Sequence, residues 1–151
     1  MDPLIRPLEP ADYGRVIAVV DEWWGGRAMA AMLPKLFFVH FADTSFALEE
    51  NGRLLGFLCG FLSQTFADEA YVHFVGVDPA ARGRGIARAL YERFFEAVDP
   101  RPLVRAVTSP VNEASVAFHR AIGFEVDRID ESYDGRGEPR VLLVWRRPPA
   151  R

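Results

Sequence analysis

The chain has little cysteine and no long apolar run, and each absence excludes a class of protein. Only one of its 151 residues is cysteine. Cys59 lies in the run LLGFLCGFL, so a disulfide framework and a cysteine-based zinc site are excluded and a reducing cytoplasm is favoured. This run ends by Gln64, far short of the roughly 20 apolar residues of a membrane span. The stretch MDPLIRPLEPADY lacks the apolar core of a signal peptide, so we expect no export.

An excess of positive charge is also missing. The net charge is −3, so the broad basic footprint of a nucleic-acid-binding protein is not expected. A local patch of Arg82, Arg84 and Arg88 leaves open an RNA-binding module with salt-sensitive binding to single strands. Half of the residues are hydrophobic, which is enough for a buried core. We expect one domain over residues 3–147.

The pattern of apolar residues predicts alternating strands and helices. Asn51-Gly52 joins two apolar runs, as in a β-hairpin. An amphipathic helix follows Arg84, and Asn112 caps a later helix that Gly123 ends. A helical segment over residues 27–40 should break near Pro34. The expected order is strand, two helices, three strands, helix, strand, helix and two strands. This order predicts an α+β fold with a mixed, mostly antiparallel sheet of about seven strands flanked by about four helices.

The most informative stretch is VDPAARGRGIARALYERFF, from Val77 to Phe95. Gly83 and Gly85 stand directly before the amphipathic helix. Glycines there let backbone N–H groups point outward, and the helix dipole adds about half a positive charge. A phosphate group would suit this loop. An ordinary helix start could have the same glycine-rich sequence. The loop alone therefore leaves open both a phosphate-binding site and a plain helix start.

Two motifs on these elements resemble the GNAT superfamily, the GCN5-related N-acetyltransferases. The acyl-CoA signature of that family is Arg or Gln, two residues, Gly, one residue, and Gly or Ala, and it is matched by Arg82, Gly85 and Ala87. The second motif, NEASVAFHRAIGF, resembles the family's later helix. The first motif alone would be weak, but both occur in order within residues 71–124. The resemblance implies an N-acetyltransferase that uses acetyl-CoA and no metal.

The resemblance also implies which residues bind acetyl-CoA. Backbone N–H groups from Arg82 to Ala87 would hold the pyrophosphate. The pantetheine arm would lie as an added strand against the backbones of Val75 and Val77, and the N–H of Val77 could polarise the thioester carbonyl. The full implied set is Val75, Val77, Arg82, Gly83, Arg84, Gly85, Ile86, Ala87, Asn112 and Ser115.

The catalytic residues depart from the family pattern. His119 stands where the family has a tyrosine that protonates the departing thiolate, and an imidazolium could do the same. Tyr71 stands where many members have a glutamate base. His73 shares a strand face with Tyr71 and Val75, so His73 acting through a water is the preferred base, with Glu69 as the fallback. A purely structural role remains open for both histidines.

Trp23, Trp24 and Arg27 lie in the segment that in the family borders the acceptor site. Adjacent tryptophans cannot both face the core from one helix, so at least one should line a groove or a subunit interface. The predicted function is transfer of the acetyl group of acetyl-CoA to a primary amine of a small molecule or peptide. The alternative is a non-catalytic acyl-CoA sensor or interaction domain. We expect a cytoplasmic protein that can form a homodimer and has no nucleic-acid or membrane partner.

Overall fold

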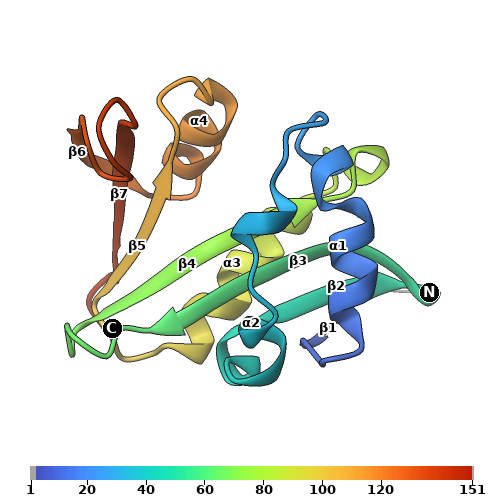
Figure 1. Cartoon of the computed structure of the whole chain (residues 1–151). Helices are drawn as coiled ribbons and strands as arrows, with labels where there is room; N and C mark the ends of the chain where they lie inside the picture. Colours follow the sequence, from blue (N-terminus) through green and yellow to red (C-terminus); the bar gives the residue numbers. More distant parts are fainter. Residues whose placement is uncertain (1–2, 151) are drawn as a thin grey trace. The chain divides into compact units, whose positions relative to one another are not determined.

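The computed structural model describes residues 3–150 (Figure 1). Within these residues the chain forms seven strands, four α-helices and three short 3-10 turns, in the order expected from the sequence. The strands are β1 (Leu4–Pro7), β2 (Phe46–Glu50), β3 (Arg53–Leu62), β4 (Glu69–Val77), β5 (Leu103–Thr108), β6 (Glu125–Asp130) and β7 (Arg140–Arg146). The α-helices are α1 (Asp12–Trp23), α2 (Leu36–Val39), α3 (Ile86–Ala97) and α4 (Glu113–Ala121). The 3-10 turns are Ala30–Met32, Ala42–Thr44 and Pro79–Ala81.

The strands form one mixed sheet in the order β1-β2-β3-β4-β5-β7-β6. β4 and β5 run parallel over four pairs, from Glu69↔Leu103 to Val72↔Ala106. Antiparallel pairing joins β1 to β2, β2 to β3, β5 to β7 and β6 to β7. The prediction of an α+β fold with a mostly antiparallel sheet is therefore confirmed.

The chain divides into two compact units. The first holds the residues up to Phe61 together with Phe74–Val98, and the second holds Leu62–His73 and the residues from Asp99 onward. β4 contributes its first five residues to the second unit and its last four to the first. The single domain over residues 3–147 stays a prediction.

The first unit packs helices on both faces of its strands (Figure 1). Phe57 of β3 is fully buried in a core that also holds Val16 and Val20 of α1 and Phe38 of α2. The preceding residue, Gly56, faces the opposite helix, α3. Successive residues of β3 thus serve the two faces, as strand geometry requires. Cys59 is fully buried in the same core, and burial raises the pKa of its thiol.

Gly56 is a point of close approach between β3 and the start of α3. A Cβ at this position would lie 2.8 Å from Cγ2 of Ile86 and 3.1 Å from the carbonyl oxygen of Gly76. Because overpacking a filled core costs about 1–3 kcal/mol, we expect Gly56→Ala to lower the free energy of unfolding by that amount in urea titrations. Gly14→Ala in α1 is the control, since a Cβ there meets nothing within 4 Å and should stabilise the helix by about 0.5–1 kcal/mol. Equal stability of Gly56→Ala and the natural chain would contradict this packing.

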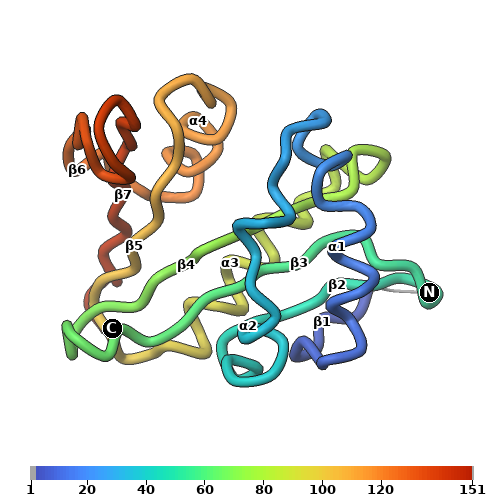
Figure 2. The backbone as a smooth tube through the Cα atoms, viewed as in Figure 1, coloured from blue at the N-terminus to red at the C-terminus, as the bar shows by residue number. Residues whose placement is uncertain are grey.

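The second unit carries the strands β5, β7 and β6 and the helix α4. Figure 2 shows the chain leaving β5, turning through α4 and returning as β6. Asn112 caps α4 as predicted, because its Oδ1 accepts the N–H of Ser115 at 3.2 Å. The helix is followed by Gly123 with φ +107°, where the indole of Trp145 packs against the glycine. Glycine is needed here because a side chain would meet both backbone strain and the ring.

The predicted helix over residues 27–40 is wrong in extent. Only the turn Ala30–Met32 and the four-residue α2 are helical, on either side of the predicted break at Pro34. Gly25 and Gly26 have φ of +72° and +89°, which ends the preceding helix. The carboxylate of Asp21 accepts the N–H groups of Met29 (2.7 Å) and Ala30 (2.9 Å) and supports this non-helical segment. An aspartate that bonds the backbone of a turn in this way competes with helix formation.

Candidate functional site

The glycine loop before α3 opens toward solvent. Residues 82–85 are exposed, and Gly83 and Gly85 have φ of +84° and +74°. A Cβ at either glycine would meet nothing within 4 Å, so the protein itself leaves this space open. Gly85 is the N-cap of α3 and supplies no side-chain cap. The first N–H groups of a helix have no acceptor within the helix, so the residues present fit an anionic group such as a phosphate.

The two arginines of this loop have partners within the first unit. Nη2 of Arg82 donates to the carbonyl oxygen of Trp23 at 3.2 Å, at the C-terminal end of α1. Nη2 of Arg84 forms a 2.6 Å ion pair with Oε2 of Glu50. Both guanidinium groups therefore hold the loop against neighbouring elements. Their contact with a ligand stays a prediction.

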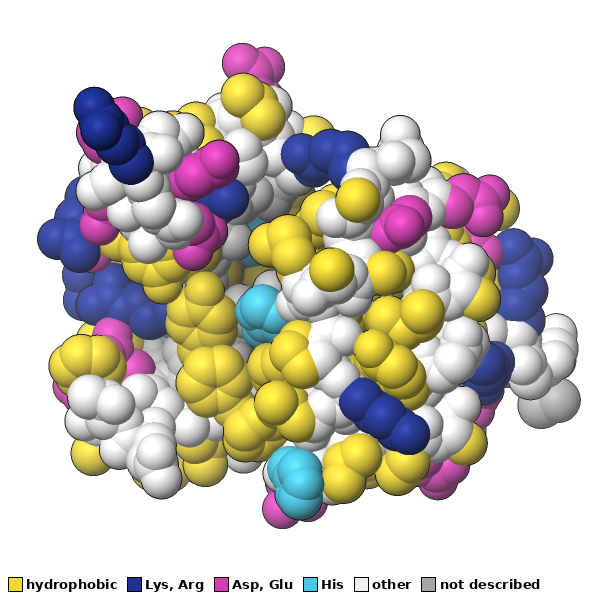
Figure 3. Space-filling model, viewed as in Figure 1, with side chains coloured by type: hydrophobic (Ala, Val, Ile, Leu, Met, Phe, Trp, Pro, Cys, Tyr) yellow, Lys and Arg dark blue, Asp and Glu magenta, His cyan; other side chains and the backbone are white. Residues whose placement is uncertain are grey.

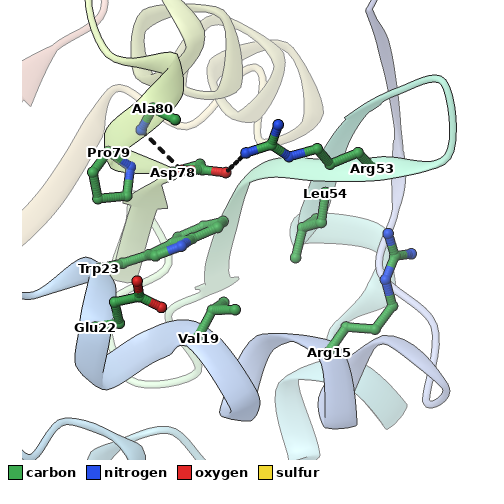
Figure 4. Close-up of a pocket in the computed structure, with 9 residues that line it drawn as sticks. All are labelled: Arg15, Val19, Glu22, Trp23, Arg53, Leu54, Asp78, Pro79 and Ala80. Atoms are coloured by element: carbon green, nitrogen blue, oxygen red, sulfur yellow. Dashed lines mark hydrogen bonds and ion pairs between the residues drawn. The ribbon is translucent and has the colours of Figure 1, made fainter.

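Asp78 fixes the turn that leads into the loop. Its Oδ1 accepts the N–H of Ala80 at 2.9 Å, and its Oδ2 accepts from Nη2 of Arg53 at 2.6 Å. The hydrogen bond from Ala80, together with the Arg53 guanidinium, lowers the pKa of this carboxyl. Figure 4 shows Arg53 reaching from the start of β3 toward Asp78 at the edge of a hollow of about 620 Å³. α1 forms the opposite wall of this hollow, where Trp23 and Val19 lie.

The end of β4 alternates between buried and half-buried residues. Phe74 and Gly76 are buried, whereas Val75 and Val77 are half-buried. Tyr71 and His73 continue the half-buried series, as the strand periodicity predicts. The proposed pantetheine contacts of Val75 and Val77 are backbone contacts, and they stay a prediction.

Two of the candidate bases, Tyr71 and Glu69, are engaged by neighbouring residues. Burial raises the pKa of Tyr71, and the charge of Tyr133 and a hydrogen bond with its phenol act in the same direction. Tyr71 therefore stays protonated at neutral pH. Glu69, the fallback base, is engaged by a 2.5 Å ion pair with Nε of Arg105, which also pairs with Asp127 at 3.2 Å. Of the three predicted bases, His73 therefore remains the candidate.

His119 is buried in the second unit, with 5% of its surface exposed. Nδ1 lies 2.7 Å from the carbonyl oxygen of Ser115, and since a carbonyl can only accept, Nδ1 carries a proton. Phe118 and Phe124 pack edge-on to the imidazole. Burial lowers the pKa of His119, although the hydrogen bond to Ser115 opposes this. The ring is therefore neutral at neutral pH, with its second proton absent from Nε2. The thiolate-acid role suggested by the family position stays a prediction.

The lowered pKa of His119 predicts a pH-dependent stability. Unfolded histidine has a pKa of about 6.5, so below that pH the unfolded chain binds a proton that the folded chain excludes. We expect the contribution of neutral His119 to the free energy of unfolding to be complete above about pH 7. It should fall as the pH drops from about 6.5 through the lowered pKa that His119 has in the folded chain. Urea titrations of the natural chain and of His119→Asn would measure it. A stability difference between the two that is the same at all these pH values would contradict the assignment.

The adjacent tryptophans both turn toward the core of the first unit. Trp23 is 6% exposed, and Trp24 is half-buried. The ring centroids of both lie about 6 Å from that of Phe57, at 6.1 and 6.2 Å. Trp23 also lines the hollow beside Asp78, as expected of at least one of the two residues. Trp24 follows the last residue of α1 and has left helical geometry, with φ −97° and ψ +26°, so both indoles can reach Phe57. Arg27 is exposed, and the acceptor-site role of the three residues stays a prediction.

Charges of both signs are mixed on one face of the molecule (Figure 3), and the predicted lack of a nucleic-acid partner stays a prediction. On the face drawn in Figure 3, Lys and Arg side chains lie among Asp and Glu and do not merge into one broad basic field. Over residues 3–150, each helix is too short or too polar to cross a membrane. The same residues contain no cluster of three or more His, Cys, Asp or Glu side chains that could hold a metal ion.

Comparison with known proteins identifies the family. Residues 9–124 match the model of the acetyltransferase (GNAT) family, and this span is well over half of the chain. The protein belongs to the GNAT acetyltransferases, so the predicted resemblance is confirmed. A solved diaminobutyrate acetyltransferase from Paenibacillus lautus, in complex with L-2,4-diaminobutyric acid and coenzyme A, has the same fold. It has a TM-score of 0.75 and 19% identity over 99% of this chain and 98% of that one.

Two relatives have similar sequences over part of their length. L-2,4-diaminobutyric acid acetyltransferase of Nocardia farcinica (strain IFM 10152) is 36% identical over 84 residues, which are 54% of this chain and 44% of that protein. Mycothiol acetyltransferase of Mycobacterium sp. (strain JLS) is 36% identical over 115 residues, which are 71% of this chain and 35% of that protein. The matched region is thus less than half of either relative.

Proposed function

We propose that the protein is an acetyl-CoA-dependent N-acetyltransferase that acts on a primary amine of a small molecule or peptide. The observation that carries this proposal is the loop from Arg82 to Ala87. This loop carries the family's acyl-CoA signature, two glycines with positive φ, and the start of a helix that has no side-chain cap. Family membership supports the same reading.

Acetyl-CoA binding rests on backbone groups. The pyrophosphate accepts N–H groups of the loop at the N-terminus of α3. The pantetheine arm bonds the backbones of Val75 and Val77. Asn112 already caps its own helix, so a contact from Asn112 or Ser115 to the cosubstrate would be additional to that structural role.

The chemical step is a direct attack on the thioester. The amine nitrogen forms a bond to the carbonyl carbon, the carbon–sulfur bond breaks, and CoA leaves as a thiolate. A primary amine with a pKa near 10 must lose its proton first, so a base is needed. His73 acting through a water is the proposed base. His119 is the second candidate, although burial lowers its pKa and so weakens it as a base. A thiol with a pKa of about 8.5 takes its proton from water at neutral pH, so no dedicated acid is required.

The acceptor in this proposal is a primary amine. The two relatives are named for diaminobutyric acid and for mycothiol, which makes small amines the first compounds to test. Acidic residues near Asp21 and Asp130 would favour a cationic acceptor. A cytoplasmic location and a homodimer complete the proposal.

One observation favours a second candidate, a non-catalytic acyl-CoA sensor. The family's glutamate and tyrosine positions hold Tyr71 and His119, and Tyr71 is kept protonated by burial. Such a protein would bind acetyl-CoA and turn over no amine.

Thermal unfolding with acetyl-CoA, free CoA and ATP tests the proposal. At about 100 times the dissociation constant, binding adds roughly 2.7 kcal/mol, or about 5–11 °C in Tm for a domain of this size. We expect both CoA species to raise Tm and ATP to leave it unchanged. An amine screen for CoA release then separates the enzyme from the sensor. No shift with either CoA species would refute both.

A further inference from the structure

Trp24 lies directly on the backbone of β4. A Cβ at Gly76 would stand 2.7 Å from Cη2 and 2.8 Å from Cζ3 of this indole. Real side chains do not approach so closely, so the ring reaches the strand only because residue 76 is glycine. The same position would be 2.7 Å from Cε1 of Phe57. The indole of Trp24 therefore packs on β4 at Gly76, in the first unit, because residue 76 has no side chain.

The indole is held firmly in this position. Its ring centroid lies 5.3 Å from that of Phe74 in an edge-on arrangement, and 6.2 Å from that of Phe57. The neighbouring carbonyl of Trp23 accepts the guanidinium of Arg82. Rings packed on several sides resist displacement because protein interiors are close-packed. Trp24 as a whole residue is half-buried.

We infer that Trp24 limits the length of the acyl group that the protein accepts. This inference rests on the proposed function, in which the backbones of Val75 and Val77 hold the pantetheine and the thioester carbonyl. Gly76 lies between these two residues, so the acyl chain begins within one residue of the indole. An acetyl methyl leaves the indole in place, whereas a butyryl chain requires volume that the indole fills. Trp24 is thus a specificity-determining residue, and the small size of residue 76 is what brings it to the strand.

A purely structural role for Trp24 makes a different prediction. Removing a core ring would lower stability and would weaken binding of all CoA species by the same factor. Removing a wall of the acyl site changes the ratio between long and short acyl chains. One methylene in a hydrophobic pocket is worth about 10–200-fold in discrimination, so the ratio is a sensitive readout.

Isothermal titration of CoA, acetyl-CoA and butyryl-CoA against the natural chain and Trp24→Ala tests the inference without an identified acceptor amine. We expect the natural chain to bind acetyl-CoA at least about tenfold more tightly than butyryl-CoA, and Trp24→Ala to lose this preference. Tyr13→Leu is the matched control. It removes an aromatic ring that packs edge-on to Phe38 in the same unit and should keep the preference.

Each result has one meaning. Binding of CoA and acetyl-CoA with an unchanged acyl ratio in Trp24→Ala overturns the inference and leaves the proposed function standing. Failure of the natural chain to bind any CoA species overturns both. If Trp24→Ala does not fold, Trp24→Leu is titrated instead, and a ratio equal to that of the natural chain again overturns the inference.

Discussion

Gly85→Ala is expected to weaken acetyl-CoA binding by about 10–100-fold without unfolding the protein. A Cβ at residue 85 meets no protein atom within 4 Å, so the added methyl group occupies only the space assigned to the pyrophosphate. Losing one hydrogen bond to a charged group costs about 1.5–3 kcal/mol, which corresponds to this factor. Isothermal titration with acetyl-CoA measures the change.

The control for this variant is Gly52→Ala in the turn between β2 and β3. Gly52 has φ +78°, close to the +74° of Gly85, and a Cβ there also meets nothing within 4 Å. Both variants therefore carry the same left-handed strain, about 1–2 kcal/mol. Comparable affinity losses in the two would show that strain and not ligand exclusion is responsible.

His119→Asn is expected to lower kcat by about 10²–10⁴-fold while leaving acetyl-CoA affinity unchanged. The amide of asparagine can keep the donor that Nδ1 presents to Ser115, and it has no basic nitrogen to take up a proton as Nε2 can. The fold is thus retained and proton transfer is lost. CoA release with an amine from the screen gives kcat, and titration gives the affinity. Unchanged kcat would remove His119 from the chemistry.

The pH profile separates the two possible roles of His119. Burial lowers its pKa, so a proton acceptor is active above that value. We expect kcat of the natural chain to rise with pH through a pKa below about 6.5 and then to level. A thiolate acid would require the imidazolium, and kcat would then fall as pH rises through the same region. A fall in kcat with rising pH would assign His119 the role of thiolate acid that its position in the family motif suggests.

Local signals in the sequence predicted the fold well. The Asn51-Gly52 hairpin is present with φ of +54° and +78°, and Asn112 and Gly123 bound α4 as expected. These features depend on residues adjacent in sequence, so turn and cap preferences are sufficient to find them. The extent of the helix after Gly26 was wrong because the carboxylate of Asp21, several residues earlier, bonds that backbone.

The contacts that shape the candidate site could not be predicted in the same way. Arg82 bonds a carbonyl 59 residues earlier, and Arg84 pairs with a glutamate 34 residues earlier. The contact of Trp24 with Gly76 likewise joins distant parts of the chain. Such pairs leave no periodic pattern in the sequence. The signature in the loop was visible, whereas the elements that support it required the structure.

The burial of Cys59 has a practical consequence for enzymology. Thiol reagents react with the thiolate, and this sulfur is both inaccessible and held protonated by its surroundings. Each proposed turnover releases one CoA thiol. A colorimetric thiol reagent can therefore follow turnover continuously in the presence of the folded enzyme, and slow colour development without substrate would report the fraction of molecules that have opened.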